Sequence, residues 1–136
     1  MVPEKTSSVA EFINSGKSEK MTFVNSIILT NISNSDIQYG IKSIIDDYID
    51  EIMKETVKLE LTNSELMKYK YKPWLLSYHI YGTSDLDFII LRLNNMITPR
   101  DFTKSILTVL KPDGIELINN IYNSEKKYIR SNRNTL

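Results

Sequence analysis

Cysteine is absent from the 136 residues of this chain, and histidine and tryptophan occur once each. Without cysteine, the chain can form no disulfide, no thiolate metal site and no cysteine nucleophile, and its redox compartment stays open. No apolar run approaches the roughly 18 residues that span a bilayer. The first residues, MVPEKTSSVAEF, also lack the charged and then apolar layout of a signal peptide. We therefore expect a soluble intracellular product.

The chain also lacks a net charge. Its 17 basic and 17 acidic residues cancel, so no overall field would hold it on nucleic acid or on an anionic membrane. The charges are nevertheless unevenly placed: residues 36–66 carry eight acidic residues and three lysines, whereas residues 114–136 carry four basic residues and two acidic ones. Such polarity suits docking between neighbours in an assembly better than binding of a free polyanion.

Residue types that build catalytic or metal sites are scarce. His79 is the only histidine, and no second histidine, cysteine or suitable carboxylate lies at ligand spacing from it. A general-base role would need a nucleophile such as Ser77, but positions i and i+2 of a helix point to different faces. The scattered glycines form no phosphate loop. We therefore expect no enzyme activity, no metal and no cofactor, and a hydrogen-bonded or surface histidine.

The first segment mixes serine, glycine, lysine and glutamate around three apolar residues at helical spacing, Val9, Phe12 and Ile13. The segment is too short and too poorly capped to fold alone. We expect residues 1–20 to form an arm that orders only against a partner or against the body of the protein. The apolar, β-branched stretch MTFVNSIILTNI (21–32) that follows predicts a strand.

A helix is predicted next, because apolar residues recur at helical spacing from Ile41 to Met53 and form one stripe. Four carboxylates occupy its outer face: Asp46, Asp47, Asp50 and Glu51. Paired carboxylates can serve a nuclease or a metal site, yet the sequence nearby supplies no third ligand type and no phosphate cradle. We interpret the acidic face as solvated, or as docking on a basic neighbour.

The rest of the chain alternates between predicted strands and helices. Alternation predicts strands at 56–62 and 68–72, and SILTVLK (105–111) also reads as a strand. One short helix should begin at Pro73, since proline is favoured at the first helical position, and end at Gly82. Further helical segments are predicted after Thr83, at 98–101 and at 115–129. Turns are predicted at 111–114 and at 63–64, where Asn63 or Ser64 could also cap one helical turn through Met67.

One part of this pattern resembles a known fold. LysM modules commonly carry Tyr-Gly-Thr, then an apolar helix ending in Leu-Asn, then a closing strand ending near proline. The matching residues here are Tyr81, Gly82, Thr83, Leu86, Ile90, Leu93, Asn94 and Pro112. The usual Gly-Asp-Thr-Leu opening is replaced by YKYKPWLLSYHIYGT, and in that form the segment looks more like the LysM-like domain of baseplate wedge proteins of contractile-tailed bacteriophages.

The resemblance implies an α+β fold, with a small LysM-like β-α-α-β domain, an added N-terminal helix and strands, and a C-terminal helix. The expected parts are a flexible docking arm (1–20), a strand-helix-strand extension (21–65), the LysM-like domain (66–113) and a C-terminal helix with a basic tail (114–136). It also suggests that the apolar residues of YKYKPWLLSYHIYG are mostly core and near-surface packing, with the lysines on the wet side of a strand. These residues are Tyr71, Trp74, Leu75, Tyr78, Ile80 and Tyr81.

In function, the resemblance implies a structural virion protein, located in the tail or baseplate after assembly in the bacterial cytoplasm. Its expected partners are other baseplate and tail proteins, with multiple copies in a symmetric assembly and with neither nucleic acid nor membrane bound. The expected partner-binding residues are Val9, Phe12, Ile13, Asp46, Asp47, Asp50, Glu51, Lys126, Lys127, Arg130 and Arg133.

Two other functions stay open. The chain could be a LysM module that binds N-acetylglucosamine polymers in peptidoglycan, although its acidic helix and its flanking segments have no use in a lone sugar binder. Nucleic-acid binding through KYKYK (68–72) and the basic tail is opposed by the zero net charge.

Overall fold

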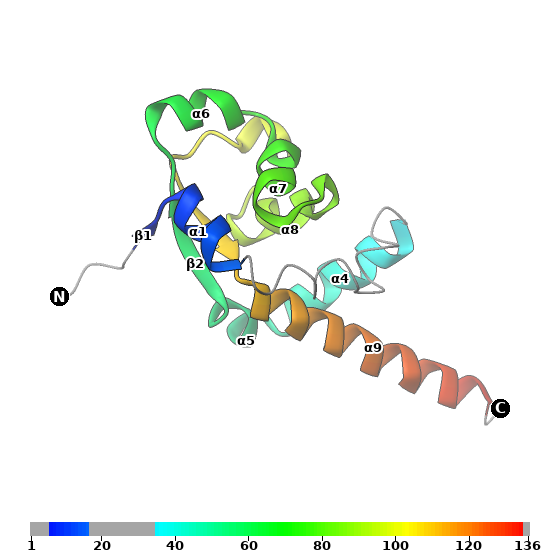
Figure 1. The fold of residues 1–136 in the computed structure, drawn as a ribbon. Coiled ribbons are helices and arrows are strands. Elements are labelled where there is room, and N and C mark those ends of the chain that lie inside the picture. The colour runs from blue at the N-terminus through cyan, green and yellow to red at the C-terminus, as the bar shows by residue number, and fades with distance from the viewer. Residues whose placement is uncertain (1–5, 17–34, 135–136) are drawn as a thin grey trace.

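A computed structural model describes residues 6–16 and 35–134 of the chain. Helices make up most of it, and they surround a three-stranded sheet of order β1-β2-β3 (Figure 1). The strands are β1 (Thr6–Ser7), β2 (Thr56–Glu60) and β3 (Ile106–Leu110). β1 runs parallel to β2, and β2 runs antiparallel to β3 with Val57 opposite Val109. The expected α+β class is confirmed.

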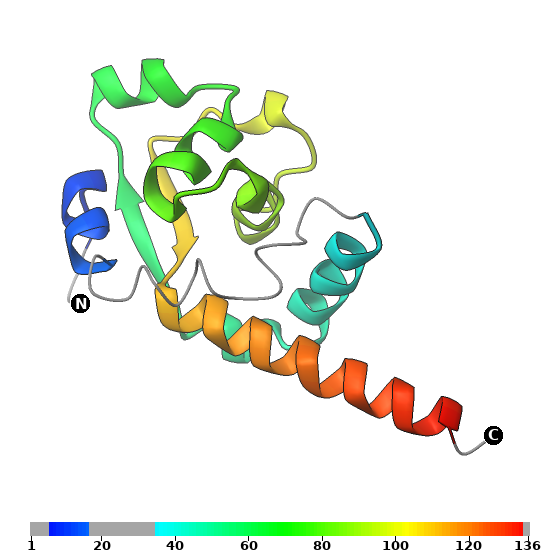
Figure 2. The same ribbon diagram turned by 45° about the vertical axis from the view of Figure 1, so that its right-hand side comes forward.

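The helices lie beside the sheet as well as at its ends (Figure 1). They are α1 (Val9–Gly16), α4 (Ser35–Asp47), α5 (Ile49–Met53), α6 (Asn63–Tyr69), α7 (Pro73–Tyr81), α8 (Asp87–Leu93) and α9 (Pro112–Asn134), with the 3-10 helices η2 (Ser84–Leu86) and η3 (Pro99–Asp101). Both views place α6 at one end of β2 and α5 at the other (Figures 1 and 2). Helix α9 begins against the body and then extends away from it (Figure 2).

One hydrophobic core joins these elements. Its largest fully buried side chains come from α4, α5, β2, α7, η2, α8 and β3, and they are Ile41, Ile44, Ile45, Ile52, Leu59, Leu76, Leu86, Ile90, Leu107, Val109 and Leu110. Strand β2, from the expected extension (21–65), pairs with β3, from the expected LysM-like domain (66–113). The two regions therefore share one sheet and one core.

The strand predicted at 68–72 is wrong. Thr62 and Glu65 form a reciprocal capping box, in which the Glu65 N–H donates to Thr62 Oγ1 at 3.1 Å and the Thr62 N–H donates to Glu65 Oε1 at 2.9 Å. Such a pair starts a helix. This helix, α6, continues to Tyr69, and Tyr71 then turns the chain with a positive φ of 64°. The antiparallel partner of β3 is therefore β2.

One helix begins earlier than predicted, and another is divided in two. The turn expected at 111–114 is wrong, because Pro112 starts α9 there and suits the first helical position. The stripe from Ile41 to Met53 lies on two helices rather than one, since α4 begins at Ser35 and the helix is interrupted at Tyr48. The strand predicted at 21–32 lies outside the described residues.

Helix α7 begins and ends where its sequence predicts. Pro73 occupies its first turn, and Gly82 follows its last residue with a left-handed φ of 83°. Glycine adopts this conformation without steric cost, whereas other residues are strained there.

Replacing Gly82 with valine should therefore lower the free energy of unfolding by about 1–3 kcal/mol. His79→Ala, which removes one partly exposed hydrogen bond, should cost about 0.5–1 kcal/mol. Urea denaturation of the two variants beside the parent chain measures this ranking. A larger loss for His79→Ala would contradict the assigned end of α7.

Two side chains close the free edge of β3. The Tyr81 hydroxyl donates to the Leu110 carbonyl at 2.9 Å and accepts from the Leu110 N–H at 3.0 Å. The Asn94 amide donates through Nδ2 to the Thr108 carbonyl at 2.8 Å and accepts through Oδ1 from the Thr108 N–H at 2.8 Å. Burial raises the pKa of the Tyr81 hydroxyl, so it stays protonated and able to donate. An edge strand with such partners is protected from pairing with another strand.

Candidate protein-interaction surfaces

The apolar cluster of the N-terminal segment packs against the body of the same chain. Val9 and Phe12 are each 5% exposed, and the Phe12 ring lies edge-on to the Tyr81 ring at 6.0 Å between centroids. Ile13 is partly buried against the same core. Val9 and Phe12 therefore present almost no surface to a partner in this structure, where the segment is ordered against the body, and their binding of a partner stays a prediction.

A cap explains why α1 forms. The Glu11 N–H donates to Ser8 Oγ at 3.1 Å, and the Ser8 hydroxyl donates to the Glu11 carboxylate at 3.3 Å. Serine followed three residues later by glutamate is a sequence signature of a helix start. The expectation of a poorly capped segment is therefore wrong, and the missed signal was SVAE at residues 8–11.

The predicted acidic face is exposed, and part of it is paired within the chain. Asp46 forms an ion pair with Arg92 of α8, in which Arg92 Nε donates to Asp46 Oδ1 at 2.8 Å. Asp47, Asp50 and Glu51 are exposed and make no ion pair with the side chains that the structure describes. In the described part of the chain, no group of three or more histidine, cysteine or acidic residues is placed to hold a metal ion.

The predicted basic residues lie on the last turns of α9. They are Lys126, Lys127, Arg130 and Arg133, and their side chains lie outside those that the structure describes. The helix itself packs on α4, α5 and β3 through its first turns, where Ile115 and Ile118 are buried. Its backbone then leaves the body (Figure 2).

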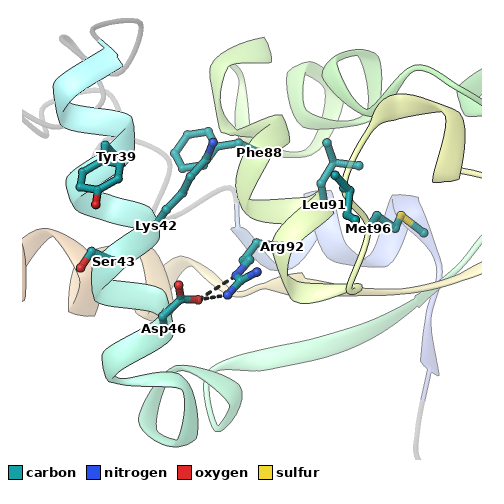
Figure 3. A pocket seen from close by; sticks show the side chains of 9 residues that line it. Tyr39, Lys42, Ser43, Asp46, Phe88, Leu91, Arg92 and Met96 are labelled. Carbon is teal, nitrogen blue, oxygen red and sulfur yellow. Dashed lines mark hydrogen bonds and ion pairs between the residues drawn. The ribbon is translucent and has the colours of Figure 1, made fainter.

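Sequence reasoning missed a groove of about 440 Å³ between α4 and α8. Its lining residues are Tyr39, Lys42, Ser43, Asp46, Phe88, Leu91, Arg92, Met96 and Ile97. The ion pair between Asp46 and Arg92 bridges its two walls, and Lys42 Nζ lies 5.7 Å from the centroid of the Phe88 ring (Figure 3). Apolar side chains such as Phe88, Leu91 and Met96 line the groove together with charged ones.

The apolar and aromatic residues of 69–82 divide between core and surface. Ile80 and Tyr81 are buried and Leu75 is partly buried, as expected. Three other rings are exposed: Tyr71 by 49%, Trp74 by 43% and Tyr78 by 58%. With Met67 and the lysines at 68, 70 and 72, they form a surface over α6, the turn after it and α7, called here the aromatic–lysine surface.

The single histidine is held by a tyrosine. His79 Nδ1 lies 2.7 Å from the Tyr69 hydroxyl oxygen, which fits the expected hydrogen-bonded histidine. The Ser77 side chain is buried and donates to the Thr83 carbonyl at 2.6 Å, so its hydroxyl is already engaged away from the imidazole. Burial lowers the pKa of His79 below 6.5, and the nearby Lys68 charge lowers it further.

The lowered pKa of His79 predicts a pH dependence of stability. The unfolded chain takes up the proton more readily than the folded one, so stability is unaffected by this group well above pH 6.5 and falls as the pH drops from 6.5 toward the lowered pKa. Urea denaturation at about pH 7.5 and about pH 5.5 should show this loss, and His79→Gln should reduce it. An unchanged difference in the variant would assign the pH dependence to carboxylates instead.

Within the described residues, none of the helices is both long enough and apolar enough to cross a membrane. Three comparisons with known proteins complete the description. No protein-family model, no curated protein and no solved structure matches the chain.

Proposed function

We propose that this chain is a structural subunit of a contractile phage tail baseplate, and that it docks neighbouring subunits through a LysM-like body and its flanking helix. The observation that carries the proposal is α9. This helix of 23 residues is anchored by its first turns and then extends past the body (Figure 2). Where a helix leaves its own core, it offers a surface on which a neighbouring subunit can dock.

The residues of the LysM-like pattern support this reading, because they have architectural tasks. Tyr81 and Asn94 hold the edge of β3, and Gly82 ends α7 in a left-handed conformation. Thr83 Oγ1 accepts from the Asp85 N–H at 3.2 Å and so caps η2. Helices α7 and α8 connect two antiparallel strands, with α6 added before them. This order fits a docking platform whose surface, rather than an internal cavity, carries the function.

Co-expression with the proteins encoded by neighbouring genes tests the proposal. The tagged full-length chain should capture tail or baseplate proteins, and a chain that lacks residues 126–136 should remain folded and lose that capture. Residues 1–20 should not be removed for this purpose, since Val9 and Phe12 belong to the core. Equal capture by the shortened chain would contradict a docking role for α9, and capture of no neighbour would contradict the proposal itself.

The exposed rings at Tyr71, Trp74 and Tyr78 favour a second candidate, a peptidoglycan-binding module, because aromatic faces pack well against sugar rings. If the docking function is correct, any affinity for peptidoglycan or chitin should be no better than about 1 mM, or about 4 kcal/mol of binding free energy. Tight retention on peptidoglycan that is lost in Trp74→Ala would favour the sugar-binding function. Tyr39→Ala, which alters an exposed ring on α4, is the matched control.

A further inference from the structure

A second exposed surface has the opposite charge to the aromatic–lysine surface. It lies on α5 and the end of α4, where the exposed carboxylates Asp47, Asp50 and Glu51 occur beside three partly exposed apolar side chains. These are Tyr48, Ile49 and Met53, exposed by 37%, 39% and 41%. We call it the acidic–apolar surface. Its carboxylates form no ion pair with any side chain that the structure describes, and Lys54 is the one basic residue between positions 43 and 57.

The aromatic–lysine surface has the matching features. Its exposed apolar groups include Trp74 and Tyr78, which lie four residues apart and hence on one side of α7. Its three lysines lie on α6 and the turn that follows, and Glu65 is the one acidic residue between positions 61 and 84. Each surface therefore combines large apolar side chains with three like charges, and the two surfaces carry opposite signs.

One copy of the chain cannot bring these surfaces together. Helix α5 ends at Met53, just before β2 begins, and α6 begins at Asn63, just after β2 ends. The five residues of β2 alone separate them by roughly 17 Å. Both views show α5 and α6 at opposite ends of the strand (Figures 1 and 2).

We propose that the aromatic–lysine surface of one copy binds the acidic–apolar surface of the next copy, head to tail. Interfaces combine an apolar centre with charges that fix partner and register, and these two surfaces supply both. A polyanion such as nucleic acid would match one surface and be repelled by the other. The zero net charge of the chain also removes overall repulsion between copies. A contact of this type joins different surfaces, so it builds a ring or a filament rather than a closed pair.

The contact is expected to be weak between free copies. Each surface offers a few side chains, well below the area of a stable interface, so a dissociation constant on the order of 100 μM to 1 mM is expected. Exposed charges are screened by salt, so the association should weaken as the ionic strength rises. This contact does not depend on the proposed baseplate function, because it is measured on the purified chain alone.

Charge reversal tests the contact by sedimentation velocity of the full chain, from tens of micromolar to about 1 mM. The parent should sediment faster as its concentration rises. One variant carries glutamate at the three lysines 68, 70 and 72, and the other carries lysine at Asp47, Asp50 and Glu51. Each variant alone should associate at least about tenfold more weakly than the parent, because each now presents like charges on both surfaces.

An equimolar mixture of the two variants should associate again, since every contact between unlike variants pairs opposite charges. The matched control carries arginine at the three lysines and should associate like the parent. Far-ultraviolet circular dichroism checks that each variant folds. If a charge-reversed variant does not fold, a neutral variant replaces it: glutamine at the three lysines, or asparagine at Asp47 and Asp50 with glutamine at Glu51. The proposal is overturned if either charge-reversed variant alone associates as strongly as the parent, or if the mixture of the two variants does not associate. The proposal is also overturned if the parent binds a fluorescent single-stranded oligonucleotide at physiological salt and the glutamate variant does not. The aromatic–lysine surface would then be a nucleic-acid-binding surface.

Discussion

Replacing Asn94 with alanine is expected to lower the free energy of unfolding by about 2–4 kcal/mol. The Asn94 amide makes three hydrogen bonds: it donates to the carbonyls of Ile90 and Thr108 at 2.7 and 2.8 Å and accepts from the Thr108 N–H at 2.8 Å. Thr108 is buried and lies on an edge strand, so no other strand can take over its outward backbone groups. Alanine would leave those groups without partners, and buried polar groups without partners are costly.

The neighbouring asparagine supplies the control for Asn94→Ala. Asn95 is exposed and has a positive φ of 56°, which glycine adopts freely, so Asn95→Gly should change stability by less than about 0.5 kcal/mol. Chemical denaturation of both variants gives the comparison. Hydrogen exchange at Leu107, Thr108 and Val109 should also become faster in the alanine variant. Equal stability of the two variants would show that the side chain of Asn94 does not hold the edge of β3.

The parts of the fold that could be predicted depend on residues close together in sequence. Proline at the first turn and glycine at the end locate α7 to the residue, because both act through local backbone geometry. The short apolar and β-branched run SILTVLK locates β3 for the same reason. The caps at Ser8 and Thr62 are equally local, and reading their S-x-x-E and T-x-x-E spacing would have predicted α1 and α6 correctly.

The strand error at 68–72 has a different origin. Lysine and tyrosine alternate there as in a half-buried strand, but this pattern does not say which face is covered or whether a helix has already begun. The pairing of β2 with β3 joins residues some fifty positions apart, and nothing local distinguishes one candidate partner from the other. Which segment pairs with β3 is therefore decided by contacts between residues far apart in the sequence, and local patterns do not predict it.

The candidate surfaces could be predicted only in part. The acidic face followed from helical spacing, yet the pairing of Asp46 with Arg92 depends on the packing of α4 beside α8. The groove between these helices has the same origin. The exposure of Trp74 and Tyr78 was missed because α7 is apolar on both faces, and aromatic residues of such a helix look like core residues in the sequence.

Two glycines in helices should respond in opposite directions to alanine. At Gly114, an added Cβ would lie 2.5 Å from Leu110 Cδ1, 2.7 Å from Leu110 Cγ and 3.0 Å from the Glu55 carbonyl oxygen. Leu110 is fully buried and cannot move aside, so Gly114→Ala should lower the free energy of unfolding by about 1–3 kcal/mol.

At Gly40, in α4, the added Cβ would meet the Tyr122 ring at 3.5 Å, which is an ordinary van der Waals contact. Alanine forms helix better than glycine, so Gly40→Ala should raise the free energy of unfolding by about 0.5–1 kcal/mol. Thermal and urea denaturation of both variants tests the pair, and each controls for the other because the chemical change is identical. If both were stabilising, the first turn of α9 would lie farther from the end of β3 than the contact of Gly114 with Leu110 requires.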